Sequence, residues 1–142
     1  MNFVFLEKIL WLHPGEGIAA TGRIPETLEL FQDHFPDFPI LPGVLAIEIL
    51  KQTAEHFLHV TGASQGEKSF LKQIQATKFS LYLKPGDEWE SQLRLLSQQG
   101  AESCWSARLL HKEKMAVSSQ FVLMCRGGVE EIVACSEGGS FS

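Results

Sequence analysis

One segment of the chain brings together side chains that could move protons on a substrate. It begins with His34 and continues through three prolines spaced three residues apart, the last of which is Pro42. Gly43 follows, and Glu48 lies five residues after Gly43. An imidazole titrates near neutral pH, which suits His34 to taking a proton from carbon. A carboxyl group so close in sequence supplies a second partner for acid–base chemistry. His34 and Glu48 are therefore the candidate catalytic pair.

The residues between this pair indicate how a substrate oxygen could be held. Repeated prolines remove backbone donors and fix φ, which excludes a regular helix before Gly43. A helix that begins at Gly43 leaves its first N–H groups unsatisfied and directs a partial positive charge toward a ligand. A developing enolate oxygen would be stabilised there. Glu48, in the second turn, would share this site, where apolar surroundings favour its neutral, proton-donating form.

The elements that must position these residues follow from the hydrophobic pattern. After Gly43 the chain has neither Pro nor Gly until Gly62 and is apolar on nearly every side, which predicts a buried helix over about Val44–Val60. Before the proline loop, residues 3–12 and 17–24 have the composition of two strands joined by a Pro- and Gly-containing turn. The helix is thus preceded by a predicted hairpin.

Strand signals dominate the rest of the chain. Phe79, Leu81 and Leu83 alternate with polar residues, which predicts a strand over 78–84 with one buried face. Three further segments suit antiparallel neighbours, and these are Trp89–Leu96, Cys104–Leu110 and Met115–Cys125. The predicted fold class is therefore α+β, with one long buried helix wrapped by an antiparallel β-sheet. We expect a single domain over 1–126 and a flexible tail over 127–142.

Bulk properties exclude several classes of function. A net charge of −5 gives no basic footprint for nucleic acid. The three cysteines lack CxxC spacing, so neither a disulfide framework nor a zinc site is indicated. The apolar stretch at residues 3–6 is too short to span a bilayer and has no basic region before it. We therefore expect no membrane insertion and a cytoplasmic location.

The segment 34–48 resembles the signature of the FabA/FabZ-type 3-hydroxyacyl-acyl-carrier-protein dehydratases, which reads His-Phe-Pro-Gly-x-Pro-x-x-Pro-Gly-Val-x-x-x-Glu. All but one of the fixed positions match. The similarity extends to residues 31–32, to Gln52, to Lys78-Phe79 and to the block at 84–87, so it covers most of the chain. Three separated blocks in the same order are hard to obtain by chance.

This resemblance implies a hot-dog fold and a homodimer, or a trimer of dimers, in which His34 of one subunit faces Glu48 of the other. It implies that His34 takes the C2 proton of a (3R)-3-hydroxyacyl thioester and that Glu48, as the acid, assists departure of the C3 hydroxyl as water. The Gly43 amide would bind the thioester carbonyl. The other motif residues would line the substrate tunnel or support the site, and these are Phe35, Pro42, Val44 and Gln52.

The resemblance also implies the partner and the pathway. The substrate would arrive on the phosphopantetheine of acyl carrier protein, and the trans-2-enoyl product would serve fatty-acid or related polyene or polyketide biosynthesis. No metal or organic cofactor is needed, because the thioester itself acidifies C2 and the protein supplies orientation and electrostatics.

The chain departs from the family pattern at three positions. Asp37 stands where the family usually has Gly, and Ile49 and Lys51 stand where it has small residues. Lys51 lies three residues beyond Glu48 on the predicted helix, which is close enough for an ion pair. Such a pair would favour the charged form of Glu48 and oppose a proton-donating role.

Two other functions use the same residues. A hot-dog thioesterase would use Glu48 or Asp33 to activate water on the thioester, although hydrolysis does not require an imidazole at position 34. A non-catalytic acyl-carrier or acyl-chain binding module would result if Ile49 and Lys51 have altered the tunnel and the motif survives only as architecture.

Overall fold

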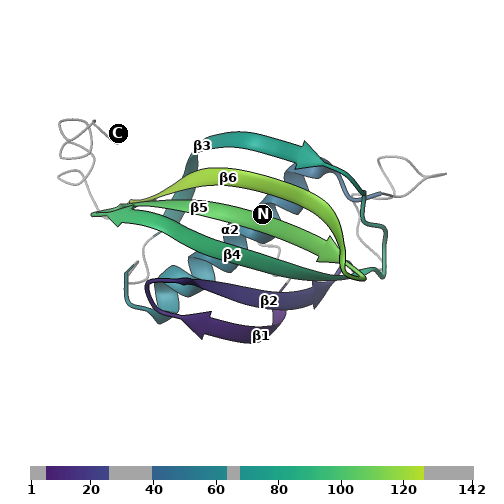
Figure 1. Ribbon diagram of the computed structural model, residues 1–142, viewed down its shortest axis with the longest axis horizontal. Coiled ribbons are helices and arrows are strands. Elements are labelled where there is room, and N and C mark those ends of the chain that lie inside the picture. The colour runs from purple at the N-terminus through teal and green to yellow at the C-terminus, as the bar shows by residue number, and fades with distance from the viewer. Residues whose placement is uncertain (1–5, 26–39, 64–67, 127–142) are drawn as a thin grey trace.

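The computed structural model describes residues 6–25, 40–63 and 68–126, in which one long helix lies against a six-stranded antiparallel sheet (Figure 1). This arrangement confirms the predicted α+β class with one helix and an antiparallel sheet. In chain order the elements are β1 (Leu6–His13), β2 (Gly17–Arg23), α2 (Gly43–Val60), β3 (Lys68–Phe79), β4 (Glu88–Gln99), β5 (Glu102–His111) and β6 (Lys114–Arg126).

The strands lie in the order β1-β2-β4-β5-β6-β3. The strand that precedes α2 therefore pairs with one that follows it, since β2 is hydrogen-bonded to β4 from Gly17–Arg94 to Arg23–Glu88. The helix crosses behind the sheet in Figure 1, and the curved strands cover it. Among the described strands, β1 and β3 form the two edges of the sheet.

The two N-terminal strands form the predicted hairpin. Its turn contains Gly15 with a φ of 80°, and the Glu16 amide donates to the His13 carbonyl at 2.9 Å. Gly17 then starts β2 so close to β4 that a Cβ atom there would lie 2.1 Å from the Leu93 carbonyl oxygen. A side chain at position 17 would therefore push the two strands apart.

The helix α2 forms where the proline loop ends. Its interior contains no Pro or Gly, and it ends where the Thr61 amide donates to the Phe57 carbonyl at 3.0 Å, before Gly62 takes a φ of 82°. This confirms the predicted helix, which begins one residue earlier than expected. Nine of its residues are buried, and these are Leu45, Ala46, Ile47, Ile49, Leu50, Thr53, Ala54, Phe57 and Leu58.

The core lies between α2 and the concave face of the sheet. The rings of Phe57 on α2 and Trp105 on β5 meet edge to face, with centroids 5.1 Å apart, and both are almost fully buried. A polar contact also joins the layers, because the hydroxyl groups of Thr53 and Ser91 lie 2.9 Å apart with both residues fully buried. Each buried large apolar side chain contributes about 1.5–3 kcal/mol.

The strand predicted over 78–84 is wrong in its bounds, because β3 spans Lys68–Phe79. Beyond Phe79 the Ser80 and Leu81 amides both donate to the Ala116 carbonyl, at 2.8 and 3.2 Å, so the one-to-one ladder with β6 stops there. Leu83 is nevertheless buried and Leu81 half-buried, while the other residues of the segment 80–84 are exposed, and the segment is not a strand.

Two expectations concern parts of the chain outside the described residues. The predicted flexible tail, 127–142, lies there entirely, and so does the start of the predicted domain 1–126. In the described part of the chain, no helix is long and apolar enough to cross a membrane.

Candidate active site

The candidate site is built on the start of α2. Pro42 precedes the first turn with φ −56° and ψ 144°, a conformation that suits its ring, and its carbonyl accepts a hydrogen bond from the Leu45 amide at 3.0 Å. One residue earlier, the Leu41 amide donates to the Leu83 carbonyl at 2.7 Å. The helix start is therefore fixed to the segment that follows β3.

Gly43 lies in close contact with an aromatic ring. A Cβ atom built on Gly43 would be 2.9 Å from both Cε1 and Cζ of Phe79, the last residue of β3. The Phe79 ring in turn stacks parallel to Tyr82, with centroids 6.4 Å apart and an interplanar angle of 5°. Glycine is thus required at position 43 for this contact, and an aromatic pair stands beside the helix N-terminus.

Glu48 lies in the second turn of α2 and has a polar neighbour at each carboxylate oxygen. Its Oε2 accepts a hydrogen bond from Gln52 Nε2 at 3.3 Å, and its Oε1 lies 3.9 Å from Lys51 Nζ. The Glu48 side chain is 30% exposed and the Lys51 side chain 19% exposed. The Glu48–Lys51 ion pair predicted from the sequence is confirmed.

The Lys51 ammonium group has a second carboxylate neighbour one turn further along the helix. Its Nζ lies 3.8 Å from Glu55 Oε2, and Glu55 accepts a hydrogen bond from the Ser69 hydroxyl of β3. The half-buried residues at positions 48, 51, 52 and 55 form a polar stripe along α2. The sequence had indicated a helix that is apolar on nearly every side, and that prediction is wrong. The polar stripe of α2 reaches the edge strand β3.

The structure places five of the seven predicted site residues together. Pro42, Gly43 and Val44 form the helix start, where Val44 is 73% exposed, and Glu48 and Gln52 lie on the following turns. His34 and Phe35 lie outside the described residues. Asp33, a candidate base in the thioesterase alternative, and Asp37, a departure from the family pattern, lie outside the described residues too.

Sequence reasoning missed the aromatic pair at this site. Phe79 was assigned to the buried face of a strand, yet it is 40% exposed and covers Gly43, and Tyr82 is 51% exposed. The signal that could have indicated Phe79 is its place in the Lys78-Phe79 block, which lies far from the motif in sequence. Nothing in the local pattern marks Tyr82.

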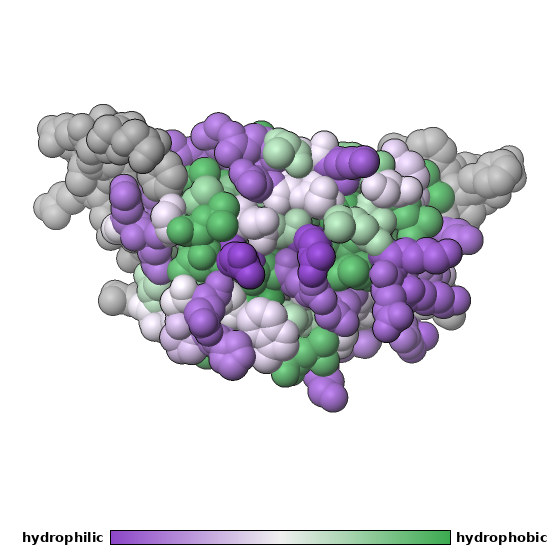
Figure 2. Space-filling view, viewed as in Figure 1, coloured by the Kyte–Doolittle hydropathy of each residue, from purple (hydrophilic) through white to green (hydrophobic). Residues whose placement is uncertain are grey.

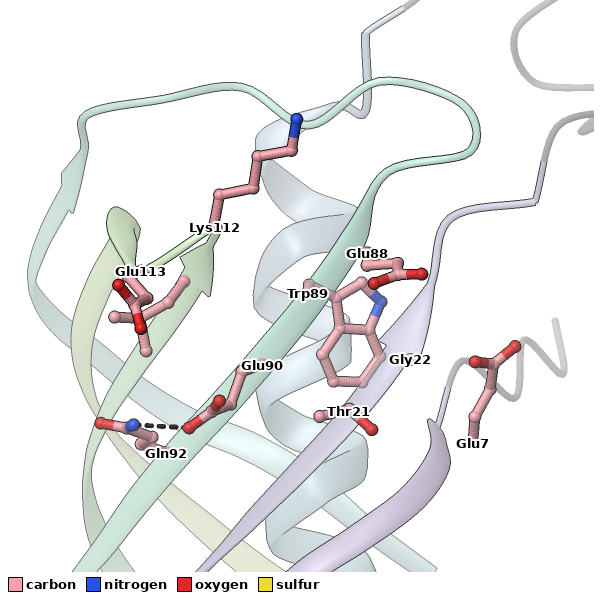
Figure 3. Close-up of a pocket in the computed structure, with 10 residues that line it drawn as sticks. Glu7, Thr21, Gly22, Glu88, Trp89, Glu90, Gln92, Lys112 and Glu113 are labelled. Atoms are coloured by element: carbon pink, nitrogen blue, oxygen red, sulfur yellow. Dashed lines mark hydrogen bonds between the residues drawn. The ribbon is translucent and has the colours of Figure 1, made fainter.

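Two open grooves of the protein lie away from this site. One groove, of about 590 Å³, is lined by Glu90, Gln92 and Glu113 among others (Figure 3). The second, of about 450 Å³, is lined by Trp11, Gln92 and Arg108 among others. Glu90 and Gln92 alternate along β4 with residues packed on the helix side, so both grooves lie on the outer sheet face. On that face hydrophilic and hydrophobic side chains are interspersed (Figure 2).

The arrangement at the start of α2 suits general acid–base chemistry on a carbonyl compound. The first-turn amides can stabilise negative charge on an oxygen, and the Glu48 carboxyl group lies on the next turn. The described residues contain no group of three or more His, Cys, Asp or Glu side chains that could hold a metal ion. Burial raises the pKa of the Cys104 thiol, which makes it a poor nucleophile.

Comparison with protein families gives a match over most of the chain. A family model described as ApeI-like, for the ApeI dehydratase, matches residues 12–120. The 3-hydroxyacyl-acyl-carrier-protein dehydratase FabZ of Levilactobacillus brevis is 32% identical over 133 residues, covering 94% of this chain and 78% of that protein.

Solved structures share the fold. The dehydratase heterocomplex ApeI:P from Xenorhabdus doucetiae contains a chain with a TM-score of 0.73 and 16% identity, and the match covers 92% of this chain and 88% of that one. A probable thioesterase from Bartonella henselae has a TM-score of 0.60 and 18% identity, covering 78% of this chain and 92% of that one. These likenesses bear out the hot-dog fold.

Proposed function

The chain belongs to the ApeI-like dehydratase family, and we propose that it dehydrates (3R)-3-hydroxyacyl thioesters on acyl carrier protein to trans-2-enoyl thioesters. The protein is a hot-dog-fold dehydratase, a lyase. The proposed substrate is the one for which its FabZ relative is named, and the proposed pathway is fatty-acid or related polyene or polyketide biosynthesis.

One observation supports the proposed reaction, and it concerns the groups at the start of α2. Pro42-Gly43 opens α2 beneath the Phe79 ring, and Glu48 follows in the second turn with its carboxylate held by Gln52. Elimination of water from a 3-hydroxyacyl thioester needs an oxyanion donor for the enolate and a group near the C3 hydroxyl. Both kinds of group lie together at this helix end.

Each site residue has a role in the proposed reaction. His34 takes the C2 proton, the Gly43 amide binds the thioester oxygen as negative charge develops on it, and Glu48 assists departure of the C3 hydroxyl as water. Gln52 orients Glu48 through its amide group. The other support residues of the proposed site are Phe35, Pro42 and Val44.

We propose that the complete site forms in a homodimer, with His34 of one subunit facing Glu48 of the other. The support is the position of β3 at the edge of the described sheet, where the side chains of Phe70 and Ile74 are 40% and 47% exposed. Two β3 strands related by a two-fold axis would extend the sheet across the dimer. A trimer of such dimers remains part of this proposal.

The carrier and the absence of a cofactor are also proposals. The substrate would be held on the phosphopantetheine arm of acyl carrier protein, and the reaction would run without a metal or organic cofactor in the cytoplasm. The thioester supplies the acidity of C2, so the protein needs only to orient and to stabilise charge.

The experiment is to incubate the purified chain with 3-hydroxyacyl carrier protein and, separately, with the enoyl carrier protein. Enoyl absorbance should rise from the 3-hydroxyacyl substrate and fall from the enoyl substrate, and both reactions should reach the same equilibrium. A His34→Ala variant should lose most of the rate, and full activity in that variant would sink the assignment. Co-purification with a second hot-dog chain would replace the homodimer by a heterocomplex of the kind named for the Xenorhabdus structure.

The same samples separate the alternatives. A thioesterase would release free thiol from the carrier, which a colorimetric thiol assay detects. A binding module would retain acyl carrier protein without turnover of either substrate. The proposed lyase should leave the thioester intact while the double bond forms.

A further inference from the structure

The polar stripe of α2 contains one cation between two carboxylates. Lys51 Nζ lies 3.9 Å from Glu48 Oε1 and 3.8 Å from Glu55 Oε2, so the ammonium group is shared almost equally. Its side chain is 19% exposed, which limits screening by water compared with an ion pair on an open surface. The spacing of three and four residues places all three side chains on one face of the helix.

The groups around Glu48 constrain the position of its carboxyl oxygens. An ammonium group is a donor only, and Gln52 presents its Nε2 amide, also a donor, to Glu48 Oε2 at 3.3 Å. Lys51 acts on Oε1 through its charge from 3.9 Å, and the Gln52 amide donates to Oε2, so both contacts hold the carboxyl oxygens in place as acceptors. The contacts observed around Glu48 therefore suit an acceptor better than a proton donor.

Glu55 fixes the position of the shared cation. It accepts a hydrogen bond from the Ser69 hydroxyl of β3, so the far end of the stripe is tied to the sheet while the near end holds Glu48. Lys51 thus bridges a carboxylate that is anchored by another element and one in the candidate site. A long, flexible lysine side chain loses freedom in such a bridge, which makes the bridge a positioning device.

We propose that Lys51 is a positioning residue of the dehydratase site, which keeps Glu48 fixed as a carboxylate that accepts a hydrogen bond from the C3 hydroxyl of the substrate. This inference rests on the proposed function. It differs from the sequence-based expectation, in which Glu48 supplies the proton. Lys51 itself does not touch the reacting atoms.

The elimination balances with Glu48 as acceptor. The C2–H bond breaks and its proton passes to His34, and the electron pair forms the C2=C3 double bond. The C3–O bond breaks, and the hydroxyl leaves as water with the proton that His34 returns. Glu48 orients the hydroxyl throughout and ends unchanged.

The kinetic test uses Lys51→Met, which removes the charge and keeps the length, and Lys51→Arg, which restores the charge. We expect kcat to fall about tenfold in Lys51→Met with KM changed by less than about threefold, because the orientation of a reacting group is lost. Lys51→Arg should recover most of kcat. Lys8→Met on β1, at the opposite edge of the sheet, is the matched charge control and should behave as wild type.

Two outcomes would overturn the proposal. Unchanged or increased kcat in Lys51→Met would mean that the cation does not help Glu48, and equal losses in the Met and Arg variants would mean that the side chain only fills space. Glu55→Gln removes the anchored end of the bridge while Lys51 keeps its contact with Glu48, so it should lower kcat by less than Lys51→Met does.

A readout without substrate separates this proposal from the proposed function. The ¹³C signal of the Glu48 carboxyl carbon, assigned by its loss in Glu48→Gln, should be a single narrow line, as expected for a side chain held in one position. It should move or broaden in Lys51→Met and not in Lys51→Arg. If the chain shows no dehydratase activity and the signal still changes in Lys51→Met, the Lys51 bridge is supported and the proposed function is refuted. An unchanged signal in Lys51→Met would refute the bridge.

Discussion

The ring of Phe79 lies against Gly43 so closely that a methyl group on Gly43 would be 2.9 Å from two ring atoms. This contact joins the end of β3 to the start of the helix that carries Glu48. It makes the identity of residue 43 a steric requirement in addition to any role of its amide.

We expect Gly43→Ala to displace the Phe79 ring and lower kcat/KM by about ten- to a hundredfold, because the helix start and its amide must shift. Steady-state kinetics and the melting temperature measure both effects. The double variant Gly43→Ala/Phe79→Ala makes room for the methyl group and should regain part of the stability. Equal damage in the single and double variants would show that the ring is not the obstacle.

Glu48→Gln should lower kcat by about a hundredfold or more, in the range attributed to a positioned acid–base group. Its fold should survive, since Gln52 can still approach an amide oxygen at that position. Glu113→Gln, on the β5–β6 turn, is the matched control with the same charge change. The measurement is single-turnover enoyl formation together with the circular dichroism spectrum, and wild-type turnover by Glu48→Gln would exclude Glu48 from the chemistry.

Mixing two inactive variants tests whether the site is shared between subunits. The His34→Ala variant is mixed with the Glu48→Gln variant, and the two are allowed to exchange subunits. If His34 and Glu48 of one site come from different chains, the resulting heterodimers contain one intact site. Random exchange should restore about a quarter of wild-type activity, because half of the dimers then have one working site of two. Absence of any recovery after verified exchange argues for a site within one chain.

The buried hydroxyl pair between α2 and β4 should matter for stability. Thr53 Oγ1 donates to the Ile49 carbonyl at 2.9 Å and lies 2.9 Å from Ser91 Oγ, whose other contact, to the Ala20 carbonyl, is 3.5 Å long. Thr53→Val would leave the Ser91 hydroxyl poorly satisfied and lower the free energy of unfolding by about 1–3 kcal/mol. Urea denaturation measures this loss, and adding Ser91→Ala should return part of it.

The Cys104 thiol should react slowly at neutral pH. Burial raises its pKa, and a hydrogen bond with the Trp105 backbone lowers it by less. Its thiolate fraction therefore stays small until the pH exceeds the ordinary thiol range, and alkylation by iodoacetamide at pH 8 should be about tenfold slower than that of glutathione. A Cys125→Ser/Cys135→Ser background isolates the site, and an alkylation rate at pH 8 equal to that of glutathione would contradict the shift.

The motif allowed the helix, and the places of Gly43 and Glu48 on it, to be predicted from sequence, while the roles of the site residues stay predictions. A proline loop that ends at Gly43, followed by an unbroken apolar run, leaves few alternatives to a helix that begins there, and the spacing of three residues sufficed to predict the Lys51–Glu48 pair. These features depend on local geometry, which sequence spacing encodes directly.

The parts that were wrong or missed depend on contacts between distant segments. The alternation around Leu81 is typical of a strand, but where β3 ends is decided by the Ala116 carbonyl of β6, which receives two amides. The approach of Phe79 to Gly43 likewise joins residues 36 positions apart in the chain. Local periodicity contains no information on either contact.

The edge strand β3 is irregular, and this irregularity has a consequence for any strand that adds to it. Its pairing with β6 shifts between Gln75 and Lys78, and Ala76 takes a φ of 52° there. A kink of this kind acts as a physical stop, since an incoming strand that slides by one residue would meet the bent backbone with its amides out of step. The irregularity therefore disfavours indiscriminate strand addition at this border and restricts the alignments in which a second strand can pair with β3.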